Sequence, residues 1–127
     1  MTIDQKELET ILLLDAEDRN EFFFDQISET GLVWGLCGEG WASFLDDAQG
    51  IQLFPIWSDQ ELAEVNAKGE WEGFEGKSFT LQQFVEELIP ELLQANMQLS
   101  IFKIPADSGF IAHPEVLSKR LASKFAS

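Results

Sequence analysis

Few side chains in this chain could serve as a nucleophile or a general base. The sequence has one cysteine, Cys37, and one histidine, His113. A thiolate–imidazole pair would need the two within hydrogen-bond reach, because the imidazole must take the thiol proton. A lone cysteine in an apolar run is usually a small buried hydrophobic residue, and His113 stands directly before Pro114, where a helix would begin. We therefore interpret Cys37 as a packing residue and His113 as a helix cap.

Two further patterns have the residue types of a catalytic or metal site without the spacing. Asp107, Ser108 and His113 have the side chains of a hydrolase triad, but no nucleophile-elbow sequence surrounds the serine. One Cys and one His cannot complete a zinc site, so an oxygen-only set of Glu39, Asp46 and Asp47 is the remaining metal option. Their spacing fits no EF-hand loop and favours solvated turn acids. We predict no catalytic residue, no metal and no cofactor.

The aromatic residues and one arginine indicate where a binding site could lie. Trp57 and Trp71 stand beside turn residues, and Trp71 and Phe74 are interspersed with glycines. The tryptophans are either core anchors or part of an exposed aromatic groove at which Trp57, Trp71 and Phe74 converge. Arg19 is one of two basic residues in an acidic half of the chain. It therefore either pairs with nearby acids, which we favour, or clamps an anionic ligand.

The charge of the chain is strongly negative and unevenly spread. There are 23 acidic and 8 basic residues, for a net charge of -15. Residues 1–67 have 15 acids against 2 bases, whereas residues 68–127 have 8 against 6. Such a surface repels phosphate groups, which argues against direct binding of nucleic acid or anionic membrane. The N-terminal half is the part expected to meet a basic partner.

These observations favour a non-enzymatic protein-interaction or regulatory module that presents its acidic surface to a basic protein partner. One variant is mimicry of nucleic-acid phosphates, which would require carboxylates at regular spacing on one exposed face. The alternative function is a small-molecule binder or enzyme with a pocket near Trp57, Trp71 and Arg19. No feature of the sequence indicates a particular oligomeric state.

Length and composition predict one domain that spans residues 1–127. A chain of 127 residues that is 45% hydrophobic can bury one core but not two. The start MTIDQKELE lacks the basic and apolar regions of a signal peptide, and Cys37 has no partner for an internal disulfide. The longest apolar run, Ile11 to Leu14, is far shorter than the roughly 20 residues that span a bilayer. We expect a cytoplasmic protein without a membrane segment.

The stretch from Leu32 to Trp57 has the pattern of a β-meander. Three short apolar runs, 32–37, 40–45 and 51–57, are separated by connections that contain Gly and Asp. Residues 97–104 alternate as a further strand. We predict an α+β domain: an antiparallel β-meander sheet of four or five strands, with helices packed mainly on one face.

Helix boundaries are predicted from capping residues and prolines. Asp15 and Gly31 bound a helix over residues 16–30, and Pro114 opens a last helix. Capping boxes are predicted at residues 58–61 and 80–83. Pro90 interrupts the long periodic pattern of residues 81–95 and predicts a kink or a break there. Residues 1–15 form either a short helix or an arm.

Trp34 is predicted to be a core residue. Along a strand it shares one face with Leu36, and we expect the long helix to cover that face. Replacing a buried tryptophan by alanine costs about 3 to 5 kcal/mol. The Trp34→Ala variant should then be largely unfolded or insoluble.

Several motifs together resemble a known family. They are Arg19, Val33-Trp34-Gly35-Leu36, Gly40-Trp41, Pro55-Ile56-Trp57, Glu70-Trp71-Glu72-Gly73 and Pro90. In this order they resemble a family of small bacterial proteins classed as a domain of unknown function, number twenty-seven fifty, over residues 16–125. The resemblance implies a stand-alone α+β domain of the bacterial cytoplasm. It implies no activity, because no catalytic or ligand residues are assigned to the family.

Overall fold

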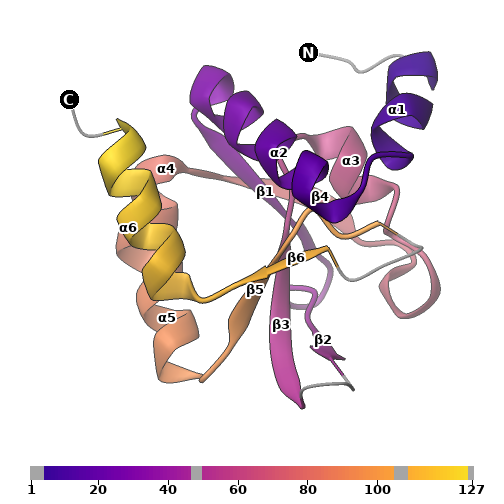
Figure 1. The fold of residues 1–127 in the computed structure, drawn as a ribbon. Coiled ribbons are helices and arrows are strands. Elements are labelled where there is room, and N and C mark those ends of the chain that lie inside the picture. The colour runs from indigo at the N-terminus through magenta and orange to yellow at the C-terminus, as the bar shows by residue number, and fades with distance from the viewer. Residues whose placement is uncertain (1–4, 47–49, 105–108, 126–127) are drawn as a thin grey trace.

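Helices and strands are combined in an α+β arrangement, as predicted (Figure 1). The computed structural model describes residues 5–46, 50–104 and 109–125; Asp47, Asp107 and Ser108 lie outside the described residues. The elements are α1 (Gln5–Leu12), α2 (Ala16–Thr30), β1 (Leu32–Cys37), β2 (Phe44–Asp46), β3 (Ile51–Ile56), α3 (Gln60–Glu64), a 3₁₀ turn (Gly69–Trp71), β4 (Glu75–Thr80), α4 (Leu81–Gln83), a π-helix (Phe84–Leu88), α5 (Ile89–Gln94), β5 (Gln98–Ile101), β6 (Phe110–Ala112) and α6 (Pro114–Phe125).

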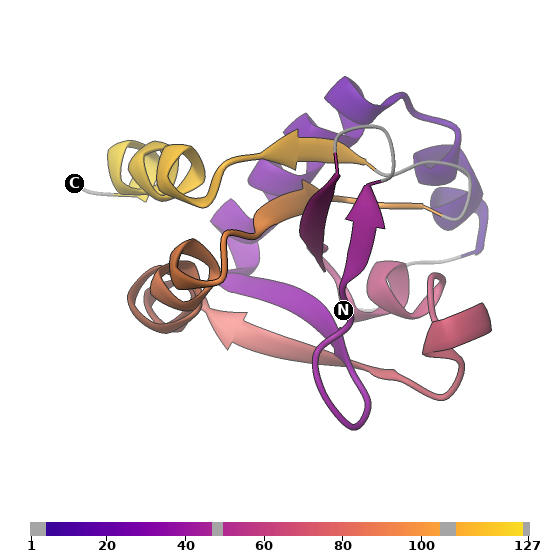
Figure 2. The ribbon, with the colours of Figure 1, turned by 90° about the horizontal axis from the view of Figure 1, so that it is seen from below.

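The strands form two sheets (Figure 2). β1 and β4 make an antiparallel pair, and β2-β3-β5-β6 make a sheet in which only the β3–β5 pair is parallel. One antiparallel bridge joins the two sheets, because Trp34 and Trp57 exchange both backbone hydrogen bonds at 2.8 Å. The strands therefore enclose a shared core instead of forming one layer. The helices lie around both sheets rather than on one face.

The α+β class is confirmed, but the predicted single antiparallel meander is wrong in its strand partners. The Gly38–Gly40 turn forms and Cys37 bridges Trp41, yet the hairpin ends after that bridge. The Trp41 ring covers Gly35, where an added Cβ would lie 3.1 Å from it, and β1 pairs with β4 along its other edge. β3 and β5 run parallel because the long connection between them crosses through α3 to α5.

The helix predicted from its capping residues Asp15 and Gly31 is confirmed as α2. The Asp15 carboxylate accepts a hydrogen bond from the Asp18 N–H at 2.9 Å, and Gly31 ends the helix with φ 72°. Its inner face buries Phe23, Phe24 and Ile27. The amino-terminal residues form a helix, α1, one of the two predicted options.

The two predicted capping boxes have different outcomes. Thr80 and Gln83 form theirs, with reciprocal bonds of 3.1 and 3.0 Å. The box predicted at Ser58 is wrong, because Asp59 occupies the cap position of α3 and makes no side-chain cap bond. The Ser58 hydroxyl instead donates to Asp59 Oδ2 at 2.9 Å.

Pro90 produces a break in the long helix, one of the predicted alternatives. A π-helix precedes it, and Pro90 occupies the first turn of α5. A wider turn there accommodates a residue that cannot donate to the preceding carbonyls. α6 begins at Pro114, as predicted, and His113 Nδ1 accepts from the Glu115 N–H at 3.2 Å. That bond confirms His113 as a cap.

The prediction that Trp34 is a fully buried core residue is wrong, because it packs against the core only as a partly buried side chain. Trp34 is partly buried and lies beside residues of α2 and the start of α3, whereas its neighbour Val33 is fully buried. Trp57 is the fully buried tryptophan. β1 is covered on both faces, so strand alternation alone could not choose which side chain would be sealed. Among the described residues, no helix has the length and apolar character to cross a bilayer.

Candidate functional site

Two surface pockets contain the polar groups of most interest. The lysine pocket has a volume of about 380 Å³ and is lined by Phe44, Asn66, Lys68, Gly69, Glu70, Trp71 and Lys103. The acidic pocket has a volume of about 310 Å³ and is lined by Gln26, Glu29, Thr30, Leu32, Trp34, Ser58, Asp59, Gln60 and Glu61. The two share no residue.

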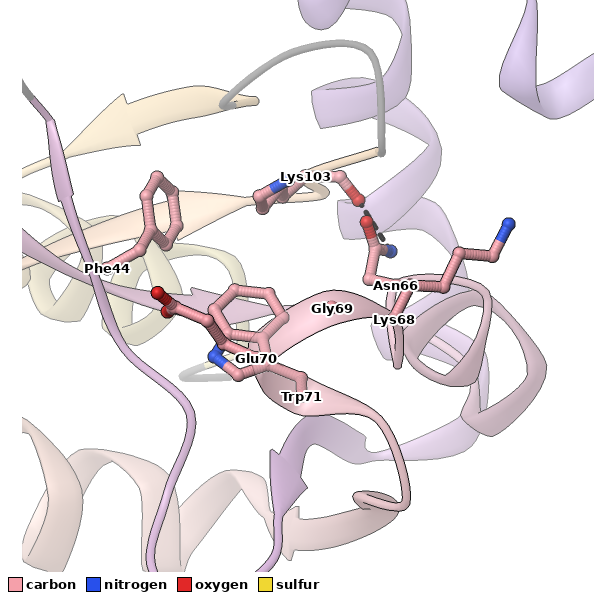
Figure 3. A pocket seen from close by; sticks show the side chains of 7 residues that line it. All are labelled: Phe44, Asn66, Lys68, Gly69, Glu70, Trp71 and Lys103. Carbon is pink, nitrogen blue, oxygen red and sulfur yellow. Dashed lines mark hydrogen bonds between the residues drawn. The ribbon is translucent and has the colours of Figure 1, made fainter.

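Three separate segments build the lysine pocket (Figure 3). Phe44 comes from β2, residues 66–71 follow α3, and Lys103 follows β5. The Phe44 and Trp71 rings are 5.9 Å apart and meet edge to face at 64°. Lys103 Nζ lies 5.5 Å from the Phe44 centroid and 5.8 Å from that of Trp71, so its charge faces both rings.

The Lys103 carbonyl ties the lysine pocket to the core. It accepts hydrogen bonds from Trp57 Nε1 at 2.7 Å and from Asn66 Nδ2 at 3.0 Å. Trp57 is fully buried, so this bond fixes the segment that follows β5 to the centre of the protein. The segment that contains Lys103 is therefore anchored to the core through its backbone carbonyl.

Asn66 lines the same pocket and has one buried acceptor without a partner among the described residues. It is 5% exposed, and Nδ2 also donates to the Leu62 carbonyl at 3.1 Å. Because both N–H groups face carbonyl oxygens, the opposite amide orientation would place Oδ1 against those oxygens. Oδ1 is buried and has no hydrogen-bond partner among the described residues. Such a buried acceptor without a partner costs about 1–3 kcal/mol.

Gly69 directs Trp71 onto the pocket wall. Its φ of 60° lies in the left-handed region, where a side chain is strained. Gly69 begins the 3₁₀ turn, which is closed by a bond from the Trp71 N–H to the Lys68 carbonyl at 3.1 Å. An added Cβ would meet nothing within 4 Å, so the requirement for glycine is conformational.

The acidic pocket contains a buried carboxylate. Asp59 is 8% exposed, and its Oδ2 accepts from Gln26 Nε2 at 3.3 Å as well as from the Ser58 hydroxyl. Glu29 and Glu61 are two further acids of the lining, and no Lys, Arg or His is among the described residues that line it. An N-cap aspartate normally bonds to the first amides of its helix, but this one is held by side chains of the pocket instead.

A row of exposed carboxylates on α2 ends at this pocket. Glu17, Glu21, Asp25 and Glu29 are exposed and recur every four residues along one helix face. Their spacing corresponds to about 6 Å per step. No salt bridge joins these four to another described residue. We call these four residues the acidic stripe.

The four residues predicted from sequence occupy different environments. Trp71 lines the lysine pocket, and Trp57 lies behind it. Phe74 packs on Gly38, where an added Cβ would come within 2.5 Å of the ring. Arg19 is buried, and it donates from Nε to the Phe102 carbonyl at 3.1 Å and from Nη1 to the Leu14 carbonyl at 2.6 Å. Arg19 and Phe74 line neither of the two pockets.

Sequence reasoning missed Lys103, Asn66 and Asp59. Lys103 carried a usable signal, since it is the one charged residue in the strand-like run 97–104. Asn66 had none, and Asp59 was assigned to a capping box. Cys37 and His113 have other partners: the thiol donates to the Gly38 carbonyl at 3.8 Å, and the imidazole caps α6. No cluster of three metal-ligating side chains occurs in the described part of the chain.

Comparison with known proteins identifies the family. The profile described as "Protein of unknown function (DUF2750)" matches residues 20–121. Neither a curated protein nor a solved structure matches the chain. The chain therefore belongs to this family of unknown function, as the motifs containing Trp34, Trp57 and Trp71 suggested.

Proposed function

We propose that the protein is a non-enzymatic interaction module that docks a basic segment of a protein partner, with a Lys or Arg side chain of that segment in the acidic pocket. The observation that supports this most is the burial of Asp59 in a pocket with two further acids and no described cation. We expect this interaction to occur in a bacterial cytoplasm.

A buried carboxylate favours an opposite charge close to it. A cation that enters the pocket would form charge-assisted hydrogen bonds with Asp59, and bonds to charged groups contribute about 1.5–3 kcal/mol each. Trp34 supplies an aromatic wall, and a cation over such a ring is favoured by about 0.5–2 kcal/mol. The pocket volume of about 310 Å³ is sufficient for one long side chain.

The acidic stripe gives the partner a route to the pocket. Its charges lie one helical turn apart and reach the pocket at Glu29. Exposed charges attract an oppositely charged segment over roughly 8–10 Å at ordinary salt concentrations, which speeds association. The regular spacing is also the geometry that phosphate mimicry would need, so a partner whose basic surface otherwise binds nucleic acid fits this proposal.

A pull-down across salt concentrations, followed by titration of the captured partner, tests the proposal. The immobilised protein should retain a basic protein at low salt and release it at high salt. Asp59→Asn preserves the shape and the bonds from Ser58 and Gln26, and it should weaken binding about tenfold, which corresponds to about 1.4 kcal/mol. The control, Glu72→Gln, removes an exposed acid outside both pockets and should bind as the wild type does.

Two results would contradict the proposal. One is the absence of any salt-sensitive protein partner. The other is an Asp59→Asn variant that is fully folded by its thermal melt and binds the partner with wild-type affinity. In that second case the acids of the pocket would be solvated surface groups, and the partner would be contacting another surface.

A further inference from the structure

We infer that the acidic pocket selects arginine over lysine in the basic segment that it binds. This inference rests on the proposed function and deepens it, because that function leaves the choice between the two cations open. The pocket is built by the last turns of α2, the start of β1 and residues 58–61. Residues 58–61 supply a carboxylate, β1 supplies an aromatic ring, and α2 supplies further acceptors, and all three suit a flat guanidinium.

Asp59 has one carboxylate oxygen that is engaged and one that is open to solvent. Oδ2 accepts from Ser58 and Gln26, whereas no described residue donates to Oδ1. In the described chain, the buried side-chain polar atoms without a partner are Oδ1 of Asn20 and Oδ1 of Asn66, so Asp59 Oδ1 keeps contact with solvent. Asp59 is only 8% exposed and lines the acidic pocket, which is where a donor can reach this oxygen.

The acceptors of the pocket come from different segments, which favours a cation with several N–H groups. The Asp59 carboxylate can only accept, so the Gln26 amide must present its N–H to it and keeps its own oxygen as an acceptor. Glu29 of α2 and Glu61 of α3 line the same pocket. The N–H groups of a guanidinium point outward in one plane, whereas those of an ammonium share a single nitrogen. A guanidinium can therefore bond to Asp59 and to an acceptor of α2 at the same time.

The Trp34 ring supplies a surface on which a flat cation can stack. Trp34 is partly buried and lines the acidic pocket. Among the described residues, no other ring and no Lys or Arg packs on it, whereas the rings of Trp41 and Trp71 each pack on another ring. A guanidinium is planar and more weakly hydrated than an ammonium, so it loses less hydration when it stacks on an indole. The Trp34 ring therefore favours arginine.

The end of α2 attracts either cation. This helix is 15 residues long, has no basic residue in its last turn, and ends at Thr30, which lines the pocket. Its last carbonyls carry partial negative charge, which favours a cation close to them. Because this attraction does not distinguish the two side chains, the selection of arginine depends on Asp59, Gln26 and Trp34.

Three peptides of otherwise identical sequence test the selection. Each has the same flanking lysines, which set a common attraction to the acidic stripe, and a central arginine, lysine or asymmetric dimethylarginine. The methylated residue keeps its charge but loses the N–H groups for paired hydrogen bonds. By calorimetry we expect saturable binding of the arginine peptide, about tenfold weaker binding of the lysine peptide and several-fold weaker binding of the methylated peptide. NMR shifts should be largest at the side-chain N–H groups of Trp34 and Gln26.

Matched variants connect the selection to the pocket. Trp34→Phe keeps an aromatic face and should keep the preference for the arginine peptide, whereas Trp34→Leu keeps apolar bulk and should reduce the preference several-fold. Asp59→Asn should bring the two affinities together, because its amide N–H₂ would face the entering donors. The control Trp41→Leu changes a ring outside the acidic pocket and should leave both affinities unchanged. Thermal melts establish that each variant is folded.

Equal affinity for the arginine and lysine peptides would overturn the inference and leave the proposed function standing. Absence of saturable binding of either peptide would contradict the proposed function as well. A preference that survives in folded Trp34→Leu would overturn the role of the ring. A methylated peptide that binds as tightly as the arginine peptide would overturn the paired hydrogen bonds to Asp59.

Discussion

The acidic pocket and the lysine pocket differ in how the chain builds them as much as in charge. The acidic pocket takes its carboxylates from an N-terminal half that is acidic throughout, so its sign follows the local composition. The lysine pocket gathers β2, the 66–71 segment and Lys103, which are far apart in sequence. Two of the few lysines of the chain thus line one pocket because tertiary contacts bring their segments together.

The pockets also differ in their connection to the core. The lysine pocket is attached to fully buried Trp57 through the Lys103 carbonyl, whereas the acidic pocket has partly buried Trp34 on its wall. Changes that loosen the core should therefore reach the lysine pocket first. The acidic pocket should respond mainly to changes in surface charge.

The largest expected effect distinguishes the two tryptophans. Trp57→Ala should lower the free energy of unfolding by about 3 to 5 kcal/mol, because it removes a buried aromatic ring and its hydrogen bond to Lys103. Trp34→Ala should cost about 1 to 2 kcal/mol, since that ring is only partly buried. Urea unfolding of both variants measures the difference. Equal losses would show that both pockets are equally attached to the core.

Arg19 gives the next largest effect. Arg19→Met keeps an apolar stem but removes the donors to the Phe102 and Leu14 carbonyls, and we expect a loss of about 2 to 3 kcal/mol. Urea unfolding measures the loss. A variant as stable as the wild type would instead revive the interpretation of Arg19 as an anion clamp.

Gly69→Ala should lower the free energy of unfolding by less than the two changes above, and it should affect only the lysine pocket. An alanine at φ 60° is strained by about 1–2 kcal/mol. The strain falls on the turn that positions Trp71, whereas partner binding at the acidic pocket should be unchanged. A thermal melt and titration of the partner measure both. An unchanged melting temperature would mean that position 69 does not require the conformational freedom of glycine.

The smallest effect concerns the acidic stripe. Glu21→Gln removes one exposed charge at a distance from either pocket and should change stability by less than about 0.5 kcal/mol. It should lower the association rate of a basic partner about two- to threefold with little effect on dissociation, because rim charges act through steering. Stopped-flow kinetics at low salt would show this. A change confined to dissociation would place Glu21 in direct contact.

The amino-acid sequence by itself determined those features whose hydrogen bonds close within a few residues. Asp15 with Asp18, Thr80 with Gln83 and the start of α6 at Pro114 needed only near neighbours, and all three were predicted. The family was likewise readable from the order of its tryptophan motifs. The capping box predicted at Ser58 is wrong, since α3 begins one residue later and the Asp59 carboxylate accepts from Ser58 and from Gln26, a residue remote in sequence.

Only the tertiary structure decided the strand partners and both pockets. The pairing of β1 with β4 and the parallel pairing of β3 with β5 join segments that are remote along the chain, and local pattern carries no information about which edges meet. Lys103 becomes a pocket residue only because β5 lies beside β3, where its carbonyl meets Trp57 and Asn66. Hydrophobic periodicity says which side chains are to be buried, whereas three-dimensional packing decides which polar groups they bring together.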